Sequence, residues 1–562
     1  MKRWISLLLA LCMALSLSLS FAESAETWTE ESLEAAADIR TSVAGDYTGK
    51  TIILHSNDVH GQLDGYATIA GLRNYFKELG ATVILADAGD FSQGSIYVSA
   101  MKGATAVEVM NAAGYDVVTM GNHEFNHGFP QLLENLAPAK FSVVCASITL
   151  DETGETVWPA TKIIETESGL KIGFFGLTTP ETVTKVNPRL IGMLTFASFN
   201  KLYESAQAAI DEIRDEADLV IGLTHLGVDK ESQANGYRSV DLLEKVTGVD
   251  MLLDGHSHTV MTAGPKGEMI QSTGTKFAYV GVVVIDDESR TIEDHFLLPT
   301  FLGSDLYMLQ QQDAETLAAA DLLIAAVDAI YGKTFATSEV LLNGERAPGN
   351  RTEETNLGDL TTDAMVWYVT KEGGPEQVEP NDIAGITNGG SIRASIEKGE
   401  VTMRDIKTVL PFLNTVTVVY VTGAELLEAM EAATFCTPEP IGAFPQTSGI
   451  EWTLDMTKAF DQGPIYMLDG KETSYYAPAS INRVTITKIN GEPFDVNKTY
   501  AIVTSNFAAD GGDAYNVFAN NESRFDTGIP IEDAVIAYVQ DVLGGVIGEE
   551  YAAPQGRETE IK

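Results

Sequence analysis

Cysteine is scarce in this sequence of 562 residues, which contains only Cys12, Cys145 and Cys436. Cys12 lies in the N-terminal apolar stretch, and the other two are far apart along the chain. A framework of disulfides is therefore not expected, even for an exported protein. We expect Cys145 and Cys436 to be small buried apolar residues in different domains.

Positive charge is also in short supply. The chain has 36 Lys and Arg residues against 80 Asp and Glu residues, which gives a formal net charge of −44. Nucleic-acid polymers and anionic lipid surfaces are held by Lys and Arg, so a general surface for either is excluded. An anionic small molecule would need metal ions or a local group of arginines to bind.

Only one long apolar run occurs, from Trp4 to Leu19, directly after Lys2 and Arg3. Small-residue cleavage sites follow it, a pattern typical of a secretory signal peptide over residues 1–25. The run is shorter than the roughly 20 residues of a bilayer span, so cleavage is favoured over an uncleaved anchor. We therefore expect a secreted or periplasmic protein without stable membrane insertion.

The length requires at least two domains. From Thr51 onward, short β-rich runs alternate with helical patterns, which predicts a layered α/β domain over residues 48–302. A long stretch without Gly or Pro follows Gly303 and predicts a linker helix within residues 303–332. Residues 333–562 mix helical and β-rich segments and are expected to form a second domain.

Histidine is rare but clustered, with seven of eight residues between His55 and His258. Five predicted strands end in a polar motif, and ligands of α/β domains gather at the carboxyl ends of strands. The residues at these strand ends are Asp58 with His60, Asp90, Asn122 with His123, His225, and His256 with His258. One such residue is more often a capped turn than a ligand, but five strand ends in register make coincidence a poor explanation.

Imidazole, carboxylate and amide oxygen together suit borderline divalent ions such as Zn²⁺ or Mn²⁺. Asp90, alone in its loop, is the natural carboxylate to bridge two ions. His55 points away from its neighbour on the strand and is expected in the core or behind the site. His127 and His295 are expected to be structural or surface residues.

These five segments resemble, in order and spacing, the calcineurin-like metallophosphoesterase family. Segments further along narrow the resemblance to the 5′-nucleotidase family, which also contains UDP-sugar hydrolases and 2′,3′-cyclic-nucleotide phosphodiesterases. The segments are Arg351 with Glu354–Asp359, Asn388–Arg393, Leu410–Phe412 and Asn506–Asp513. The resemblance covers residues 48–562, and its C-terminal motifs are the more specific ones.

The resemblance implies a four-layer α/β/β/α metallophosphoesterase domain, followed by a smaller mixed α/β domain that binds substrate. It implies two divalent metal ions and a metal-activated water that attacks phosphorus in line. One ion would be held by Asp58, His60, Asp90 and His258, and the other by Asp90, Asn122, His225 and His256. His123 is similar to the catalytic histidine of the family.

Two positions depart from the family pattern. Asn126 stands where the family usually has an Asp that orients the catalytic histidine, and an amide cannot stabilise the protonated ring as a carboxylate does. We therefore expect lower activity or an altered pH profile. Ser147 stands where the family commonly has Asn near the phosphate, which bears on substrate preference.

By the same resemblance, Phe412 and Phe507 would stack on the two faces of a nucleotide base, because aromatic rings stack on any base. Asn388 would meet the base edge, and Arg351, Arg393 and Asp513 would line the ribose or phosphate region. From sequence alone, core packing explains Phe412 equally well. The family rotates its second domain to carry substrate to the metals, and we expect the same motion here.

The function expected from these features is release of phosphate from nucleoside 5′-monophosphates, a phosphoric monoester hydrolase activity on a small-molecule nucleotide. The alternatives on the same site are a 2′,3′-cyclic-nucleotide phosphodiesterase or a UDP-sugar hydrolase. A non-enzymatic alternative is a secreted nucleotide-binding protein or adhesin. Asn126 favours this alternative, whereas the complete set of predicted metal ligands argues against it.

Overall fold

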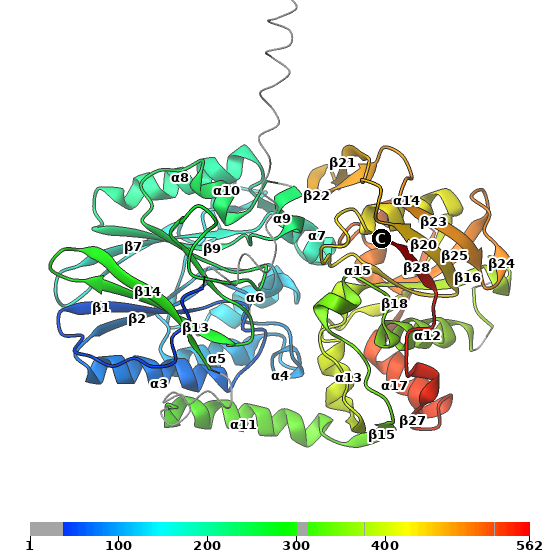
Figure 1. The fold of residues 1–562 in the computed structure, drawn as a ribbon, viewed down its shortest axis with the longest axis horizontal. Helices are drawn as coiled ribbons and strands as arrows, with labels where there is room; N and C mark the ends of the chain where they lie inside the picture. Colours follow the sequence, from blue (N-terminus) through cyan, green and yellow to red (C-terminus); the bar gives the residue numbers. More distant parts are fainter. Residues whose placement is uncertain (1–36, 235, 301–311, 372, 376, 522) are drawn as a thin grey trace, which may run out of the picture.

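The computed structural model describes residues 37–562 apart from residues 235, 301–311, 372, 376 and 522 (Figure 1). The predicted signal peptide and the first part of the predicted linker lie outside the described residues. No helix in the described part of the chain is long and apolar enough to cross a membrane.

The first domain, residues 37–300, contains two six-stranded sheets packed face to face. The strands of sheet one are, in spatial order, β14 (Thr291–Pro299), β13 (Tyr279–Asp286), β1 (Lys50–Ser56), β2 (Thr82–Asp87), β3 (Val117–Val118) and β4 (Ser142–Val143). Those of sheet two are β11 (Val260–Met261), β12 (Ile270–Thr273), β10 (Met251–Asp254), β9 (Leu219–His225), β7 (Lys171–Thr178) and β6 (Thr161–Glu165).

The strands that lead to the predicted site are parallel within each sheet. β1, β2 and β3 run parallel in sheet one, and β7, β9 and β10 run parallel in sheet two. Each is buried on both faces, which explains near-continuous apolar runs such as residues 172–177 of β7. Their carboxyl ends therefore meet at one edge of the domain.

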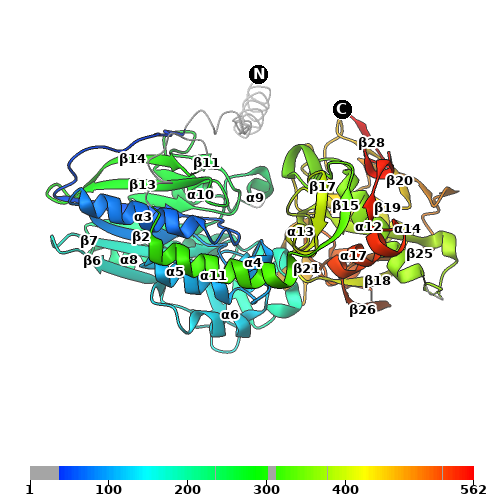
Figure 2. The same cartoon turned by 90° about the horizontal axis from the view of Figure 1, so that it is seen from below.

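Helices cover the outer face of each sheet, so the domain has four layers (Figures 1 and 2). α3 (Gly65–Glu78) and α5 (Ala104–Ala113) pack on sheet one, and α8 (Asn200–Arg214) packs on sheet two. α8 buries Leu202, Ala206 and Ile213 at helical spacing. The predicted α/β/β/α architecture is confirmed.

Shorter helices complete the first domain. They are α4 (Ile96–Ser99), α6 (Phe129–Leu136), α7 (Thr182–Lys185), α9 (Lys230–Ala234) and α10 (Ser239–Leu243). The domain also begins earlier than residue 48, because Ile39 pairs with Leu297 and Arg40 forms an ion pair with Asp294 at 2.6 Å.

α11 (Ala314–Tyr331) connects the two domains, running beneath the first domain toward the second (Figures 1 and 2). It begins at Ala314 because the Asp313 side chain accepts the backbone N–H of Thr316 as an N-cap. It packs against α3 and α5 and also against α13 (Met403–Val409). Its Asp328 accepts a hydrogen bond from Arg404 at 2.9 Å, which fixes the far end of the helix on the second domain.

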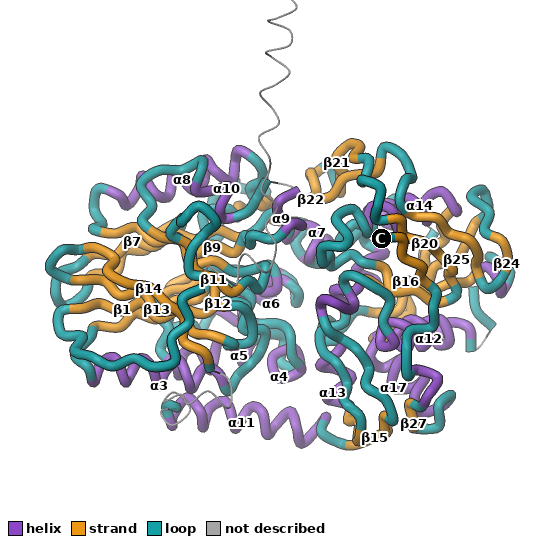
Figure 3. The backbone as a smooth tube through the Cα atoms, viewed as in Figure 1, coloured by secondary structure: helices purple, strands orange, loops and turns teal. Residues whose placement is uncertain are grey.

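The second domain, residues 334–562, mixes sheets and helices, as Figure 3 shows and as predicted. A five-stranded sheet consists of β19 (Pro445–Ser448), β16 (Ile383–Asn388), β25 (Thr499–Ser505), β18 (Thr415–Thr422) and β26 (Arg524–Pro530). A four-stranded sheet consists of β24 (Glu492–Pro493), β23 (Val484–Ile489), β20 (Ile450–Asp455) and β28 (Glu558–Ile561).

The rest of the second domain is smaller elements. The strands are β17 (Gly399–Thr402), β15 (Thr334–Ser338) and β27 (Val546–Ile547) in one sheet, with β21 (Gln462–Leu468) and β22 (Lys471–Pro478) as a hairpin. The helices are α12 (Asn356–Thr370), α14 (Gly423–Ala433), α15 (Asn506–Ala509), α16 (Asn516–Ala519) and α17 (Ile531–Asp541). Cys145 and Cys436 are unpaired and buried in different domains, as predicted.

Candidate metal centre and substrate cavity

The predicted metal ligands all follow or end strands of the first domain. Asp58 and His60 follow β1, Asp90 follows β2 and Asn122 follows β3. In sheet two, His225 is the last residue of β9, and His256 and His258 follow β10. Because the two sheets stack, these parallel strand ends bring all seven residues to one place.

The loops that carry these residues are unusual in backbone conformation. Asp58, His60, Asp90, His256 and His258 have φ values of 50°, 49°, 63°, 80° and 60°. Left-handed backbone at non-glycine residues is uncommon and tends to gather at functional sites. The strand-end loops thus turn sharply enough to aim side chains at a common centre.

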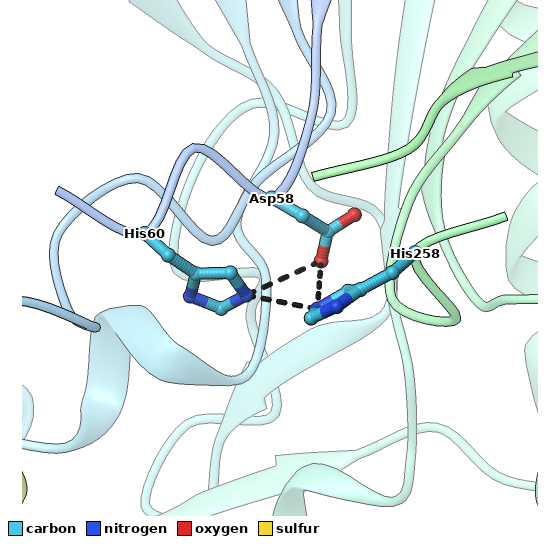
Figure 4. A group of neighbouring side chains, drawn as sticks. All are labelled: Asp58, His60 and His258. Atoms are coloured by element: carbon cyan, nitrogen blue, oxygen red, sulfur yellow. Dashed lines mark hydrogen bonds and ion pairs between the residues drawn. The ribbon is translucent and has the colours of Figure 1, made fainter. Parts of the chain in front are cut away.

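Three overlapping groups of side chains converge tightly enough to hold a metal ion. They are Asp58 with His60 and His258, His60 with Asp90 and His123, and Asp90 with His225 and His256. Figure 4 shows the first group: His60 Nε2 lies 2.9 Å from His258 Nε2, and both lie within 3.8 Å of Asp58 Oδ1. Asp90 belongs to two of the groups, as expected of a bridging carboxylate.

The hydrogen bonds of the rings show which nitrogens face the centre. His60 Nδ1 bonds Gln93 O at 2.9 Å, His225 Nδ1 bonds Ala88 O at 2.7 Å, and His256 Nε2 bonds Glu181 Oε2 at 3.0 Å. Each of these partners is an acceptor, so the other nitrogen of a neutral ring presents a lone pair to the centre. Such outer partners are typical of histidines that ligate metals.

Those lone pairs face other acceptors. His225 Nε2 lies 3.1 Å from Asp90 Oδ2, and His256 Nδ1 lies 3.0 Å from Asn122 Oδ1. Such close approach requires a cation between each pair, which is a proton where no metal is bound and a divalent ion where one is. The residues present therefore fit divalent metal ions, by the chemistry of the donor set and by its burial.

The pKa shifts agree with a centre that attracts positive charge. Burial opposes protonation of His225, but Asp90 and Asp58 outweigh it and raise its pKa to about 10. Burial likewise opposes ionisation of Asp90, yet His225 and His123 hold its pKa well below the usual range. For His60 and His258 burial prevails, together with nearby positive groups such as Arg393, and lowers their pKa values well below that of free histidine.

Glu124 holds the loop that carries Asp90. Its carboxylate accepts backbone N–H groups of Asp90, Phe91, Ser92 and Gly121 at 2.7–3.0 Å. The same loops approach so closely that a Cβ on Gly89 would meet the backbone of Gly121. Asp90 Oδ1 in turn accepts the backbone N–H of His123 at 2.8 Å, so the β2 and β3 loops are locked together.

A cavity of about 250 Å³ lies between the two domains, with the metal groups on one wall. All six predicted substrate-binding residues line it: Arg351, Asn388, Arg393, Phe412, Phe507 and Asp513. Asp90, Asn122, His123, Asn126, His256 and His258 line the opposite wall. Asp58, His60 and His225 do not line the cavity and lie buried behind that wall.

Both domains match known families. Residues 51–260 match the calcineurin-like phosphoesterases, and residues 334–520 match the 5′-nucleotidase C-terminal domain. The chain belongs to the 5′-nucleotidase family. The predicted family is confirmed, and the protein is an enzyme of the phosphoric monoester hydrolase class.

The chain is similar to known proteins along most of its length. The chain is 28% identical over 530 residues to the trifunctional nucleotide phosphoesterase YfkN of Bacillus subtilis, a match that covers 85% of this chain and 33% of that longer protein. It is 28% identical over 558 residues to a snake venom 5′-nucleotidase of Gloydius brevicauda, covering 90% and 88% of the two chains. The structure of a 5′-nucleotidase precursor from Thermus thermophilus aligns with a TM-score of 0.74 at 25% identity, covering 91% of this chain and 99% of that one.

Within this family fold, His123 lies where the two walls meet. Its Nδ1 bonds Asn126 Oδ1 at 2.6 Å, and its ring lies 5.6 Å from that of Phe412 in the second domain. Burial lowers the pKa of the His123 imidazole to about 4. Asn126 thus contacts the His123 ring through the oxygen of a neutral amide.

Arginines gather on the second-domain wall. Arg351 and Arg393 lie near each other and near Arg346, which also lines the cavity. Burial, with these neighbouring positive charges, lowers the pKa values of Arg351 and Arg393 to about 9 and about 10. Guanidinium groups crowded in this way favour an anion between them.

Sequence reasoning overlooked several residues of the cavity: Lys185, Asn187, Asp229, Glu231 and Arg346. The end of β7 was a usable signal for Lys185, because the loop after that strand reaches the same edge as the others. Arg346 and Asp229, paired at 3.3 Å across the domains, had no such signal.

The remaining expectations have mixed outcomes. His55 is buried, and its Nε2 lies 2.9 Å from Gln271 Oε1, as expected of a residue behind the site. His127, expected to be structural or at the surface, lines the cavity. Ser147 is buried and does not line it, because its hydroxyl is bonded to the backbone N–H and C=O of Thr178.

Proposed function

We propose that this protein releases phosphate from nucleoside 5′-monophosphates. The observation that carries the proposal is the cavity, which faces His/Asp groups suited to metal ions on one wall and aromatic rings, arginines and a carboxylate on the other. The metal-binding wall would hold the phosphate. The opposite wall has the groups that hold a base and a sugar away from the metals.

Two divalent ions would be held by the sets predicted above, one by Asp58, His60, Asp90 and His258 and one by Asp90, Asn122, His225 and His256. When bound, such ions polarise the phosphoryl oxygens and lower the pKa of a coordinated water. The native metal is left open between Zn²⁺, Mn²⁺ and similar ions.

The protein's own residues bind and orient the substrate. Arg351 and Arg393 place two positive charges between the walls, where the phosphate would bridge the domains. Phe412 and Phe507 both line the cavity on the second domain, where they would stack on the base. Asp513 accepts only, so it would pair with sugar hydroxyls and not with phosphate.

His123 is the residue that we propose to donate a proton to the leaving group. With Nδ1 donating to Asn126 Oδ1, Nε2 is the atom left to hold a proton for the departing sugar oxygen. Asn126 fixes the orientation of the ring without adding charge. Because burial disfavours the charged ring, the negative charge of the substrate would be needed to favour its protonation.

We further propose that the protein is exported. The N-terminal segment has the charge and apolar pattern of a signal peptide, and one relative is by name a venom protein. N-terminal sequencing of the mature protein tests this: an N-terminus near residue 26 supports export, and an intact Met1 contradicts it.

The decisive experiment measures phosphate release from 5′-AMP with added Mn²⁺, together with metal content. Wild type should be active and bind two ions, whereas Asp90→Ala should lose activity to background along with bound metal. Asp64→Ala, which removes an exposed carboxylate of the same domain, is the matched control and should behave as wild type.

Failure would also be informative. Activity on 2′,3′-cyclic AMP or UDP-glucose but not on 5′-AMP would replace the proposed substrate while keeping the metal centre. Metal and nucleotide binding without turnover of any of these would favour the nucleotide-binding protein.

A further inference from the structure

Lys185 crosses from the first domain to the second-domain wall of the cavity. It ends α7, and its Nζ donates to Tyr475 Oη at 2.8 Å and to Asp513 Oδ1 at 3.2 Å, both in the second domain. A third partner, Glu231, belongs to its own domain. An ammonium has three N–H donors, so all three are engaged.

Asp513 is held by both domains at once. Its Oδ2 accepts the side-chain N–H of Asn388 at 2.8 Å, and its backbone N–H donates to Thr184 O at 2.7 Å, across the domain boundary. Its backbone is left-handed, with φ of 48°, and only 3% of its side chain is exposed. The direction of this carboxylate is therefore fixed by the docking of α7 on the 510–513 loop.

Lys185 is not an open receptor for phosphate. Burial opposes ionisation of Glu231, but Lys185 beside it lowers its pKa to about 2. The ammonium thus lies between two carboxylates, Glu231 and Asp513, and the cluster is negative as a whole. Because the ammonium is fully engaged, the phosphate is left to Arg351 and Arg393. The carboxylate of Asp513 suits hydrogen-bond donors, and the hydroxyls of a sugar are such donors.

We propose that Lys185 is a positioning residue that holds the Asp513 carboxylate toward the 2′- and 3′-hydroxyls of the substrate's sugar. The inference rests on the proposed function for the identity of the ligand. A residue of the first domain would then contribute to recognition of the sugar, although the residues that contact the sugar belong to the second domain.

A purely structural role for Lys185 makes a different prediction, and Lys471 provides the matched control. Lys471 also crosses between the domains, donating to Asp151 Oδ2 and Leu194 O at 2.7 Å each, but it has no contact with Asp513. If Lys185 only helps the domains to dock, replacing either lysine should weaken all ligands alike.

The test is calorimetric binding of adenosine and of 2′,3′-dideoxyadenosine, which lacks both hydroxyls. Wild type should prefer adenosine, and Lys185→Met should weaken adenosine binding by about tenfold while leaving the dideoxy compound unchanged, as expected for loss of a hydrogen bond to a charged group. Lys471→Met should keep the wild-type preference. Tyr475→Phe, a milder change, should reduce the preference in the same direction as Lys185→Met.

Turnover gives a second readout. On 5′-AMP, Lys185→Met should raise KM more than it lowers kcat, and the rate on p-nitrophenyl phosphate, which has no sugar, reports the state of the metal centre in each variant. Equal weakening of adenosine and dideoxyadenosine by Lys185→Met, or no preference in wild type, would overturn the inference.

The two proposals fail in different ways. If wild type hydrolyses 5′-AMP but Lys185→Met keeps the full preference for the hydroxyls, the inference is wrong and the function stands. If wild type does not hydrolyse 5′-AMP but shows a preference for adenosine that Lys185→Met removes, the function is wrong and the positioning role stands.

Discussion

The two walls of the cavity are assembled by different means. The metal wall is made within the first domain from strand ends, with left-handed backbone at five of its seven predicted ligands. The opposite wall comes from loops of the second domain, and its charged residues Asp513 and Arg346 have partners in the first domain. One wall is complete by itself, whereas the other is completed only by docking.

The two walls therefore differ in where the free-energy cost of forming them arises. Left-handed backbone at non-glycine residues costs about 1–3 kcal/mol each, and in the metal wall hydrogen bonds within the loops, such as those to Glu124, offset it. The second-domain wall has left-handed backbone at Leu413 and Asp513 as well, but it also depends on the domain interface, where breaking one contact changes how the domains dock. The first wall is thus suited to holding metal ions in a fixed geometry. The second is suited to binding the substrate and releasing the product.

The largest effect should come from fixing the docking permanently. Asn187 Nδ2 and Asp510 Oδ2 are hydrogen-bonded at 3.0 Å across the interface, so Asn187→Cys with Asp510→Cys puts two thiols on facing sides of it, where oxidation or a short reducible crosslinker can join them. If substrate enters by rotation of the second domain, steady-state turnover of 5′-AMP should fall to background and return on reduction. Each single variant is a control, since Cys145 and Cys436 are buried. Unimpaired turnover in the oxidised double variant would contradict the motion.

A change confined to the metal wall should affect all substrates equally. Glu124→Gln places amide N–H groups against backbone donors, and we expect a loss of roughly 10- to 100-fold in metal affinity or activity, as for other outer partners of metal ligands. 5′-AMP and ribose 5-phosphate, compared at several Mn²⁺ concentrations, should lose activity in parallel. Glu134→Gln, on the exposed face of α6, controls for the charge change. A loss limited to 5′-AMP would mean that the two walls are not separable.

A change confined to the second-domain wall should affect only substrates that contain a base. Phe412→Ala should reduce kcat/KM for 5′-AMP relative to ribose 5-phosphate by roughly tenfold, because stacking on an aromatic ring contributes about 1–3 kcal/mol per base. Leu413→Ala alters the neighbouring lining residue and should leave this ratio near the wild-type value. An unchanged ratio in Phe412→Ala would show that the ring packs against protein and not against a base.

The smallest effect is expected where the walls meet. Asn126→Asp adds a carboxylate beside His123 Nδ1, which favours the protonated imidazole and raises the pKa that burial lowers to about 4. Protonated His123 then persists to higher pH, so the basic limb of the kcat profile for 5′-AMP should move up by about one pH unit. Metal content should not change. A profile that stays in place would exclude His123 as the group that holds the proton.

Much of the fold could be predicted because its signals are local. Apolar runs at Thr51–Leu54, Lys171–Leu177 and Leu219–Leu223 are strands in the structure, and the polar motifs after them lie at one edge of two stacked sheets. The linker helix is described from Ala314, where Asp313 caps it, and the first part of the predicted linker lies outside the described residues. Ser147 was placed near the phosphate, but a bond to Thr178 across the sheets turns its hydroxyl away.

The sequence by itself determined the metal wall and the class of chemistry, because ligand type and strand-end spacing are properties of short segments and left-handed turns are local. Only the tertiary structure decided which residues complete the other wall. Lys185 and Asp513 are 328 positions apart, and Arg346 and Asp229 are 117 apart. No local pattern encodes such pairs, since each depends on how two separately folded domains dock.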